Sequence, residues 1–237
     1  MLRIENLTKT YGEKRAVDNL SLHVAPGEIY GFLGHNGAGK STTIKSVVGL
    51  LAFDEGEITV CGKSVKTDAL AVKREIAYLP DNPDLYEFLS GIKYLNFVAD
   101  IFNVPSDVRQ ERIRKYSDMF ELTADLAQPI SAYSHGMKQK LALISALIHE
   151  PKLIIMDEPF VGLDPKASKA VKELMREVCN RGGAIFFSTH VLEVAEKLCD
   201  KVAIITHGRI ASSGKMEDVL GDKSLESVFF ELEERAE

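Results

Sequence analysis

A glycine-rich run in the first fifth of the chain has the residue types needed to hold a polyphosphate. Residues 34–41 read Gly-His-Asn-Gly-Ala-Gly-Lys-Ser and directly follow the apolar segment 29–33. In this pattern the glycines let successive backbone N–H groups face one anion, and a following helix adds its positive end. Lys40 would then supply charge for the β- and γ-phosphates, and the Ser41 hydroxyl would bind Mg²⁺. The alternative is a glycine-rich turn without a ligand. The candidate nucleotide-binding residues of this run are Gly34, His35, Asn36, Gly37, Ala38, Gly39, Lys40, Ser41 and Thr42.

Two consecutive carboxylates, Asp157 and Glu158, end a second apolar segment, Leu-Ile-Ile-Met at 153–156. Carboxylates at the end of a buried strand are costly unless a cation or a water network lies beside them. We expect Asp157 to hold Mg²⁺ through its water shell. Glu158 is expected to point the other way along the pleat and to polarise an attacking water. The alternative is that Asp157-Glu158-Pro159 only terminates a strand.

The remaining sequence alternates short apolar segments with helical patterns. Strands are expected at 20–24, 28–33, 57–60, 76–79, 153–156, 184–187, 202–206 and 209–212. Helices are expected at 42–51, 135–149, 165–180 and 193–198. Apolar residues also recur at helical spacing from 90 to 120, with a break at 103–106 after which Ser106 is a candidate cap for a second helix. Alternating helices and buried strands favour a parallel sheet covered by helices, with 82–133 as a helical insertion.

Composition narrows the class of protein. The chain has 237 residues, of which 45% are hydrophobic, and a formal net charge of −6, which disfavours nucleic acid as a partner. Its three cysteines lack the spacing of a metal site, so we expect reduced, mostly buried thiols. The N-terminal residues lack the apolar core of a secretory signal, and the apolar stretch 141–148 is too short to cross a bilayer. We therefore expect a chain that does not enter a membrane by itself.

A third motif, Tyr-Ser-His-Gly-Met-Lys-Gln at 133–139, lies between the glycine-rich run and the acidic pair. Taken in order, these motifs resemble the nucleotide-binding subunit of ABC transporters over about residues 1–215. The resemblance implies an α/β fold: a P-loop NTPase core with a mostly parallel sheet, an N-terminal antiparallel β-subdomain and an inserted α-helical subdomain. It implies one domain over 1–237, with a core at 1–81 and 134–215, a helical subdomain at 82–133 and a tail at 216–237.

The resemblance also gives roles to residues outside the glycine-rich run. Tyr11 would stack on the adenine of ATP, unless it only packs at a turn. Ser134 and Gly136 match the serine and second glycine of the family's LSGGQ segment. That segment contacts the γ-phosphate of an ATP held by a second cassette, which gives a head-to-tail dimer, a homodimer or one with a paralogue.

Two further candidate positions, Asp164 and His190, follow Glu158 in the sequence. Leu163-Asp164 resembles the D-loop that couples the two sites, although Asp164 before Pro165 also fits a helix N-cap. His190 matches the switch histidine that contacts the γ-phosphate and positions water, unless it caps a helix or lies at the surface. With Glu158 it forms the candidate catalytic pair.

The chain departs from the family pattern at three places. Asp81 occupies the position of the glutamine loop; an acid can bind Mg²⁺ but, when ionised, cannot donate a hydrogen bond. The loop therefore either senses the γ-phosphate differently or only links the core to the insertion. His135 and Met137 replace the first glycine and the glutamine of LSGGQ. We expect tolerated variation and little change on His135→Gly, whereas a histidine beside a triphosphate could instead add pH dependence.

Three segments, at 78–86, 133–140 and 224–232, resemble those of bacterial export-type ATPases that pair with a separate membrane permease. The resemblance implies ATP and Mg²⁺, a cytoplasmic location at the inner face of the membrane, and an integral membrane partner docking in a groove near residues 81–100. Phe88, Tyr94 and Phe97 are candidates for that contact, although their helical spacing also favours core packing. The rival functions are a soluble ABC ATPase, for example in iron–sulfur assembly, and a nucleotide sensor that does not hydrolyse ATP.

Overall fold

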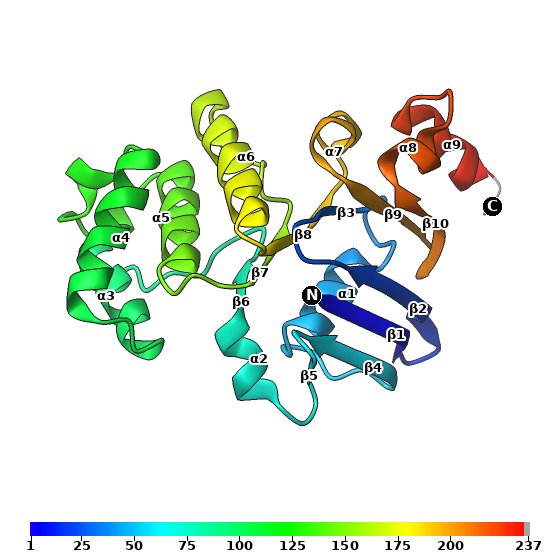
Figure 1. The fold of residues 1–237 in the computed structure, drawn as a ribbon, viewed down its shortest axis with the longest axis horizontal. Helices are drawn as coiled ribbons and strands as arrows, with labels where there is room; N and C mark the ends of the chain where they lie inside the picture. Colours follow the sequence, from blue (N-terminus) through cyan, green and yellow to red (C-terminus); the bar gives the residue numbers. More distant parts are fainter. Residues whose placement is uncertain (235–237) are drawn as a thin grey trace.

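A computed structural model describes residues 1–234, which form two β-sheets with helices packed around them (Figure 1). The larger sheet has six strands in the order β10-β9-β3-β8-β7-β6, all parallel except β10. Its strands are β3 (Ile29–Leu33), β6 (Ile76–Leu79), β7 (Leu153–Asp157), β8 (Ala184–Thr189), β9 (Lys201–Thr206) and β10 (Arg209–Lys215). The expected parallel sheet is thus present, with one antiparallel strand at its edge.

The smaller sheet is antiparallel, with strand order β2-β1-β4-β5. It consists of β1 (Leu2–Tyr11), β2 (Lys14–Val24), β4 (Glu55–Val60) and β5 (Lys63–Ser64). Only Gly12 and Glu13 separate β1 from β2, so Tyr11 and Lys14 are directly paired at the end of this hairpin. Directly paired residues share one face of a sheet.

Two hydrophobic cores lie on opposite faces of the large sheet. Along β3, Ile29 and Leu33 belong to one core and Tyr30 and Phe32 to the other, as the two-residue period of a strand requires. One core contains α1 (Lys40–Val47) and the antiparallel sheet, and the other contains most of the remaining helices. Because both faces are covered, β7 and β8 are buried along their whole length.

The other helices are α2 (Ala69–Glu75), α3 (Gly91–Ile101), α4 (Ser106–Met119), α5 (His135–Leu147), α6 (Pro165–Asn180), α7 (Leu192–Leu198), α8 (Met216–Leu220) and α9 (Leu225–Glu234). Short 3₁₀ turns lie at Thr123–Asp125 and Ile130–Ala132. The helix expected at 42–51 begins earlier, at Lys40, and ends at Val47. Ser106 is the first residue of α4 and not its cap, because Pro105 occupies the N-cap position.

The helical insertion forms a separate group at one end of the molecule, where Figure 1 shows α3, α4 and α5 together in green. α5 contacts both α3 and α4 and also β6. It therefore joins the insertion to the six-stranded sheet. In the tail, α9 packs on α7 through its buried face.

Aromatic side chains at the start of the insertion are more exposed than their helical spacing favours. Phe88 is 82% exposed and Phe97 is 41% exposed, whereas Tyr94 packs partly against the core. Tyr86, which is also exposed, contacts all three rings at centroid distances of 5.9 Å to Phe88, 6.2 Å to Tyr94 and 5.5 Å to Phe97. Core packing is thus wrong for Phe88 and Phe97, because no element of residues 1–234 covers that face.

Two expectations about the whole chain can be compared with the structure. Cys61, Cys179 and Cys199 are free thiols, and the last two are buried, as expected. Burial raises the pKa of Cys179 to about 11, so this thiol stays protonated and unreactive near neutral pH. None of the helices within residues 1–234 combines the length and the apolar character needed to cross a membrane.

Candidate functional site

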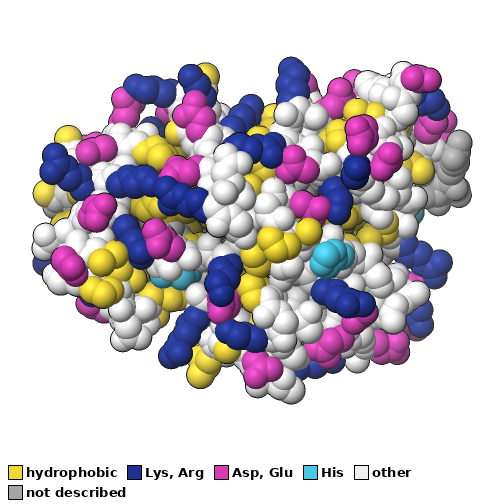
Figure 2. Space-filling view, in the orientation of Figure 1, with side chains coloured by type: hydrophobic (Ala, Val, Ile, Leu, Met, Phe, Trp, Pro, Cys, Tyr) yellow, Lys and Arg dark blue, Asp and Glu magenta, His cyan; other side chains and the backbone are white. Residues whose placement is uncertain are grey.

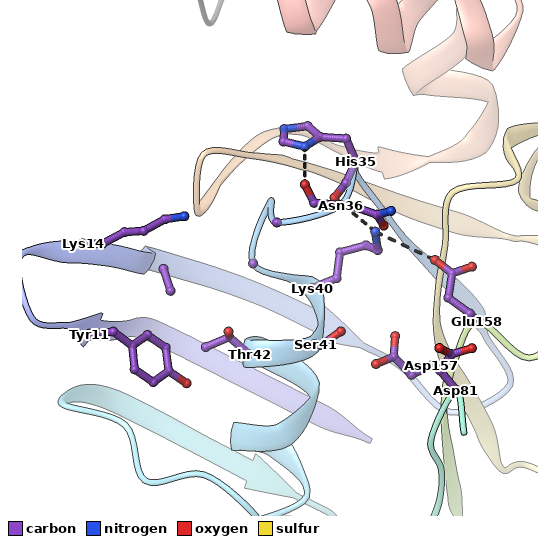
Figure 3. Close-up of a pocket in the computed structure, with 13 residues that line it drawn as sticks. Tyr11, Lys14, His35, Asn36, Lys40, Ser41, Thr42, Asp81, Asp157 and Glu158 are labelled. Carbon is purple, nitrogen blue, oxygen red and sulfur yellow. Dashed lines mark hydrogen bonds and ion pairs between the residues drawn. The ribbon is translucent and has the colours of Figure 1, made fainter. Parts of the chain in front are cut away.

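A cavity of about 380 Å³ opens where the glycine-rich run meets the carboxyl ends of the large sheet (Figure 3). The run follows β3, the acidic pair ends β7, and His190 follows β8, which lies between β3 and β7. Because carboxyl ends of parallel strands meet at one edge, three separate motifs converge there. The cavity is lined by Tyr11, Lys14, Ala16, His35, Asn36, Gly37, Gly39, Lys40, Ser41, Thr42, Asp81, Asp157 and Glu158.

Eleven of those lining residues are sequence candidates, and Lys14 and Ala16 are additional. Gly34 and Ala38, also candidates, are buried parts of the loop and do not line the cavity. A Cβ at Gly34 would lie 2.6 Å from the Ile205 carbonyl oxygen, so this glycine is required for packing. The two-residue hairpin after Tyr11 is the sequence signal that would have found Lys14, because it pairs the two residues across the strands.

The loop backbone can only follow its path with glycine at Gly39. Its φ is +114°, and a Cβ there would lie 2.5 Å from the Ala16 carbonyl oxygen. The loop is also braced from outside, because the Gly208 N–H donates to the Ala38 carbonyl at 2.9 Å. The curled backbone thus forms a rigid cradle at the start of α1, the arrangement that binds phosphate.

Lys40 is directed into this cradle. Its Nζ donates to the carbonyl oxygens of Gly34 at 2.6 Å and His35 at 3.2 Å, and lies 3.9 Å from Glu158 Oε1. Burial lowers the pKa of the Lys40 ammonium, against the opposing effect of the Glu158 and Asp157 carboxylates. A partly desolvated ammonium held by carbonyls has a strong preference for an anion, and a phosphate oxygen provides one.

The acidic side of the cavity is built from the end of β7. Ser188 of the neighbouring strand donates its hydroxyl to Asp157 Oδ1 and so fixes that carboxylate. Glu158 does not point the other way along the pleat, as the sequence predicted. It follows the strand with φ +51°, outside extended geometry, so both carboxylates line one cavity. A left-handed glutamate costs of order 1 kcal/mol, and the Glu158 N–H is held by the Ser188 carbonyl at 3.1 Å.

Glu158 and His190 contact each other directly. His190 Nδ1 lies 2.9 Å from Glu158 Oε1, and the His190 N–H is 3.4 Å from Oε2. The glutamate side chain is mostly buried and the imidazole is half exposed. The two candidate catalytic residues, 32 positions apart, are thus brought together beside the cavity, which Glu158 lines and the exposed His190 does not.

The donor set of the cavity fits Mg²⁺. Ser41, Asp157 and Asp81 place one hydroxyl and two carboxylates around the same space (Figure 3). Mg²⁺ prefers few protein oxygens and keeps waters and phosphate oxygens as its other ligands. Within residues 1–234 no group of three or more His, Cys, Asp or Glu side chains that could hold a metal ion is present.

The Ser134 motif lies outside this cavity. Ser134 is the N-cap of the 13-residue helix α5, and its Oγ accepts the Met137 N–H at 3.2 Å. Neither Ser134 nor Gly136 lines the cavity, and Ser134 is exposed. His135 packs against Gly162, where a Cβ would lie 2.8 Å from the imidazole. The start of α5, with the exposed Ser134 at its N-cap, therefore lies away from the glycine-rich cradle.

Asp164 has the N-cap geometry expected from the sequence. Its Oδ1 accepts the Ala167 N–H at 2.8 Å, and Pro165 is the first residue of α6. This backbone hydrogen bond, together with Lys140, lowers the pKa of the Asp164 carboxyl. Capping and a coupling role are compatible, because the loop from Glu158 ends at this residue.

The fold and the cavity define a P-loop nucleotide-binding cassette, and comparisons with known proteins agree. Residues 17–161 match the sequence profile of the family described as "ABC transporter". The uncharacterized ABC transporter ATP-binding protein YhcH of Bacillus subtilis (strain 168) is 34% identical over 238 residues, which cover 100% of this chain and 77% of YhcH. The linearmycin resistance ATP-binding protein LnrL of the same organism is 34% identical over 219 residues, covering 92% of this chain and 70% of LnrL.

A solved structure of the ATP-binding subunit of an ABC transporter matches the fold with a TM-score of 0.95 at 34% identity. The match covers 98% of this chain and 99% of that one. The chain belongs to the ABC transporter ATP-binding protein family, whose members bind ATP. The predicted fold class and family are thus confirmed.

Proposed function

We propose that this chain hydrolyses ATP and drives a separate membrane permease for export, with two cassettes enclosing ATP between them. The observation that carries the proposal is the Glu158–His190 contact at the rim of the phosphate cradle, 2.9 Å between Oε1 and Nδ1. A cavity that only sensed a nucleotide would not need a mostly buried carboxylate in a strained backbone position beside the phosphates.

The proposed reaction is the hydrolysis of ATP, in which each residue of the site has a separate role. A water oxygen attacks the γ-phosphorus while the bond from that phosphorus to the bridging oxygen breaks, which yields ADP and inorganic phosphate. Glu158 accepts the water proton, and His190 holds the Glu158 carboxylate in place and contacts the γ-phosphate. Lys40 and the loop N–H groups bind the β- and γ-phosphates. A general base of this kind contributes about 10²- to 10⁴-fold in rate.

Ser41, Asp157 and Asp81 would hold Mg²⁺ in this cavity. When bound, the ion supplies positive charge that neutralises the β- and γ-phosphate oxygens. Tyr11 is half exposed at the hairpin end of the cavity, with the Lys9 ammonium 5.4 Å from its ring centroid. An exposed ring at the mouth of the cavity supports stacking on adenine over packing at a turn.

A second cassette would complete the site. Ser134, the Gly136 N–H and the positive end of α5 form an exposed set of groups suited to an anion. Because these groups lie away from the chain's own cradle, the anion they suit is the γ-phosphate of an ATP held by another cassette. Two chains, or this chain and a paralogue, would then bind head to tail with two ATP molecules in the interface.

The exposed aromatic patch, defined as Tyr86, Phe88 and Phe97, is the proposed docking surface for the permease. Figure 2 shows hydrophobic side chains lying between charged ones over the region of α3. Tyr86 and Phe88 belong to the same β6–α3 connection as Asp81, so a movement of Asp81 at the nucleotide cavity could be passed to a permease segment that contacts the patch. This arrangement would locate the chain at the cytoplasmic face of a membrane. Export is supported by LnrL, a relative named for resistance to linearmycin.

Two measurements test the proposal together. The purified chain should release phosphate from ATP only when Mg²⁺ is present, and in mild detergent it should co-purify with a multi-spanning membrane protein. A double variant, Phe88→Ser with Phe97→Ser, should keep the ATPase rate and lose the membrane protein. Hydrolysis with only soluble partners would favour a soluble ABC ATPase, and ATP binding without phosphate release would favour a sensor; either result would overturn the proposal.

A further inference from the structure

Three consecutive side chains at the start of α5 contact two loops, the β6–α3 loop at two points and the β7–α6 loop at a third. Lys138 forms an ion pair with Glu87, Gln139 Nε2 donates to the Asp81 carbonyl oxygen at 2.8 Å, and Lys140 Nζ lies 3.2 Å from Asp164 Oδ2. Consecutive residues of a helix point about 100° apart, so one helical turn can reach three separate points around it. We call Lys138, Gln139 and Lys140 the α5 node.

The three contact points belong to different parts of the proposed machine. Asp81 lines the nucleotide cavity with Asp157 and Glu158. Asp164 ends the loop that begins at Glu158. Glu87 lies between Tyr86 and Phe88 of the exposed aromatic patch. The α5 node therefore contacts the Asp81 loop at the nucleotide cavity, the far end of the loop that begins at Glu158, and the surface where a permease would dock.

Gln139 is the buried centre of the node and is only half satisfied. The residue is 1% exposed, and its Oε1 has no hydrogen-bond partner within residues 1–234. A buried acceptor without a partner costs more than a single amide hydrogen bond returns. An apolar side chain of the same shape would therefore stabilise the fold as well or better, so stability does not explain an amide here.

We infer that Gln139 is a positioning residue that couples the Asp81 loop to α5. The inference rests on the proposed function and adds to it a link between the nucleotide cavity, the Ser134 end of α5 and the docking patch. The Nε2 group holds the loop in the present position. The unpaired Oε1 offers a hydrogen bond to any backbone N–H of the loop that approaches it, which gives the loop a second stable position. Movement of Asp81 towards a bound triphosphate would thereby move α5.

The decisive variant is Gln139→Met, which keeps the length of the side chain and removes both polar atoms. We expect an unchanged or higher Tm, an ATP affinity within about twofold of the parent, and a steady-state ATPase kcat lower by at least about threefold, the size of effect that coupling residues carry. Lys169→Met, which removes an exposed ion pair with Glu173 on α6, is the control and should change none of these values.

Lys140 provides an independent test from the surface side of the node. Lys140→Met should lower kcat with little change in ATP affinity, and Lys140→Arg should restore it, because arginine keeps the charge that contacts Asp164. An unchanged kcat in Gln139→Met, or a kcat loss accompanied by a matching loss of Tm, would overturn the inference. A parent chain that neither binds nor hydrolyses ATP would instead overturn the proposed function, so the two failures are distinguishable.

Discussion

Replacing Glu158 with glutamine removes the proposed proton acceptor and leaves the shape of the site intact. If Glu158 takes the proton of the attacking water, its loss should lower kcat by about 10²- to 10⁴-fold, which corresponds to about 3–5 kcal/mol in the activation free energy. The loss of kcat arises in the chemical step, because the contacts of the Glu158 side chain contribute little to the stability of the fold.

The structure predicts that stability changes little in the same variant. The contact between Glu158 and His190 is 2.9 Å, but the imidazole is 54% exposed, so the pair is worth at most about 1 kcal/mol. That value corresponds to about 2–4 °C in Tm for a domain of this size. Glutamine also keeps the same backbone length and φ, so the strain at this position is unchanged.

The assay is steady-state phosphate release with a parallel measurement of ATP affinity. We expect Glu158→Gln to bind ATP as tightly as the parent and to turn over at least about 100-fold more slowly. Glu173→Gln, a change at an exposed α6 residue, should retain the parental rate. Hydrolysis by Glu158→Gln at the parental rate would refute the assignment of the base, and a loss of ATP affinity would refute the separation of binding from chemistry.

Three further results are expected. Lys14→Met should raise the ATP KM by about three- to tenfold with kcat unchanged, because the cation lines the cavity, whereas Lys45→Met on α1 should not; equal KM values would remove Lys14 from the site. Burial lowers the pKa of His149 from its ordinary 6.5. As the pH falls, this imidazole is therefore protonated in the unfolded chain before it is protonated in the folded chain. The contribution of His149 to the free energy of unfolding should then be complete above pH 6.5 and should decrease as the pH falls below 6.5, which denaturant titrations can measure. A His149→Gln variant whose free energy of unfolding depends on pH in the same way would contradict this. His135→Gly should leave the ATPase rate and its pH profile nearly unchanged, and a shifted profile would show that the imidazole contributes charge near the triphosphate.

The motifs could be predicted from sequence because each one combines residue type with local context. The prediction of a phosphate-binding loop from Gly34 to Ser41 depended on a strand before the run and a helix after it. The prediction for Asp157 depended on a buried strand before it. All three elements are present. The sheet edge that unites them follows from parallel topology, which the alternation of helices and strands already indicated.

Other parts could not be predicted, for physical reasons. The direction of Glu158 depends on one left-handed residue, and sequence patterns assume that the pleat continues. Phe88 and Phe97 have helical spacing, but Phe88 precedes α3, and periodicity does not show whether another element covers Phe97. The α5 node depends on contacts between residues 24 to 58 positions apart, such as Gln139 with Asp81, which have no local signature.

The most direct test of the account is the mass of the Glu158→Gln chain in solution, measured by sedimentation with and without ATP and Mg²⁺. We predict a single chain without nucleotide and a particle of twice that mass, containing two ATP molecules, when both are added. A chain that binds ATP and keeps the mass of one copy, or that pairs equally well without nucleotide, would contradict the claim that two cassettes close around the triphosphate.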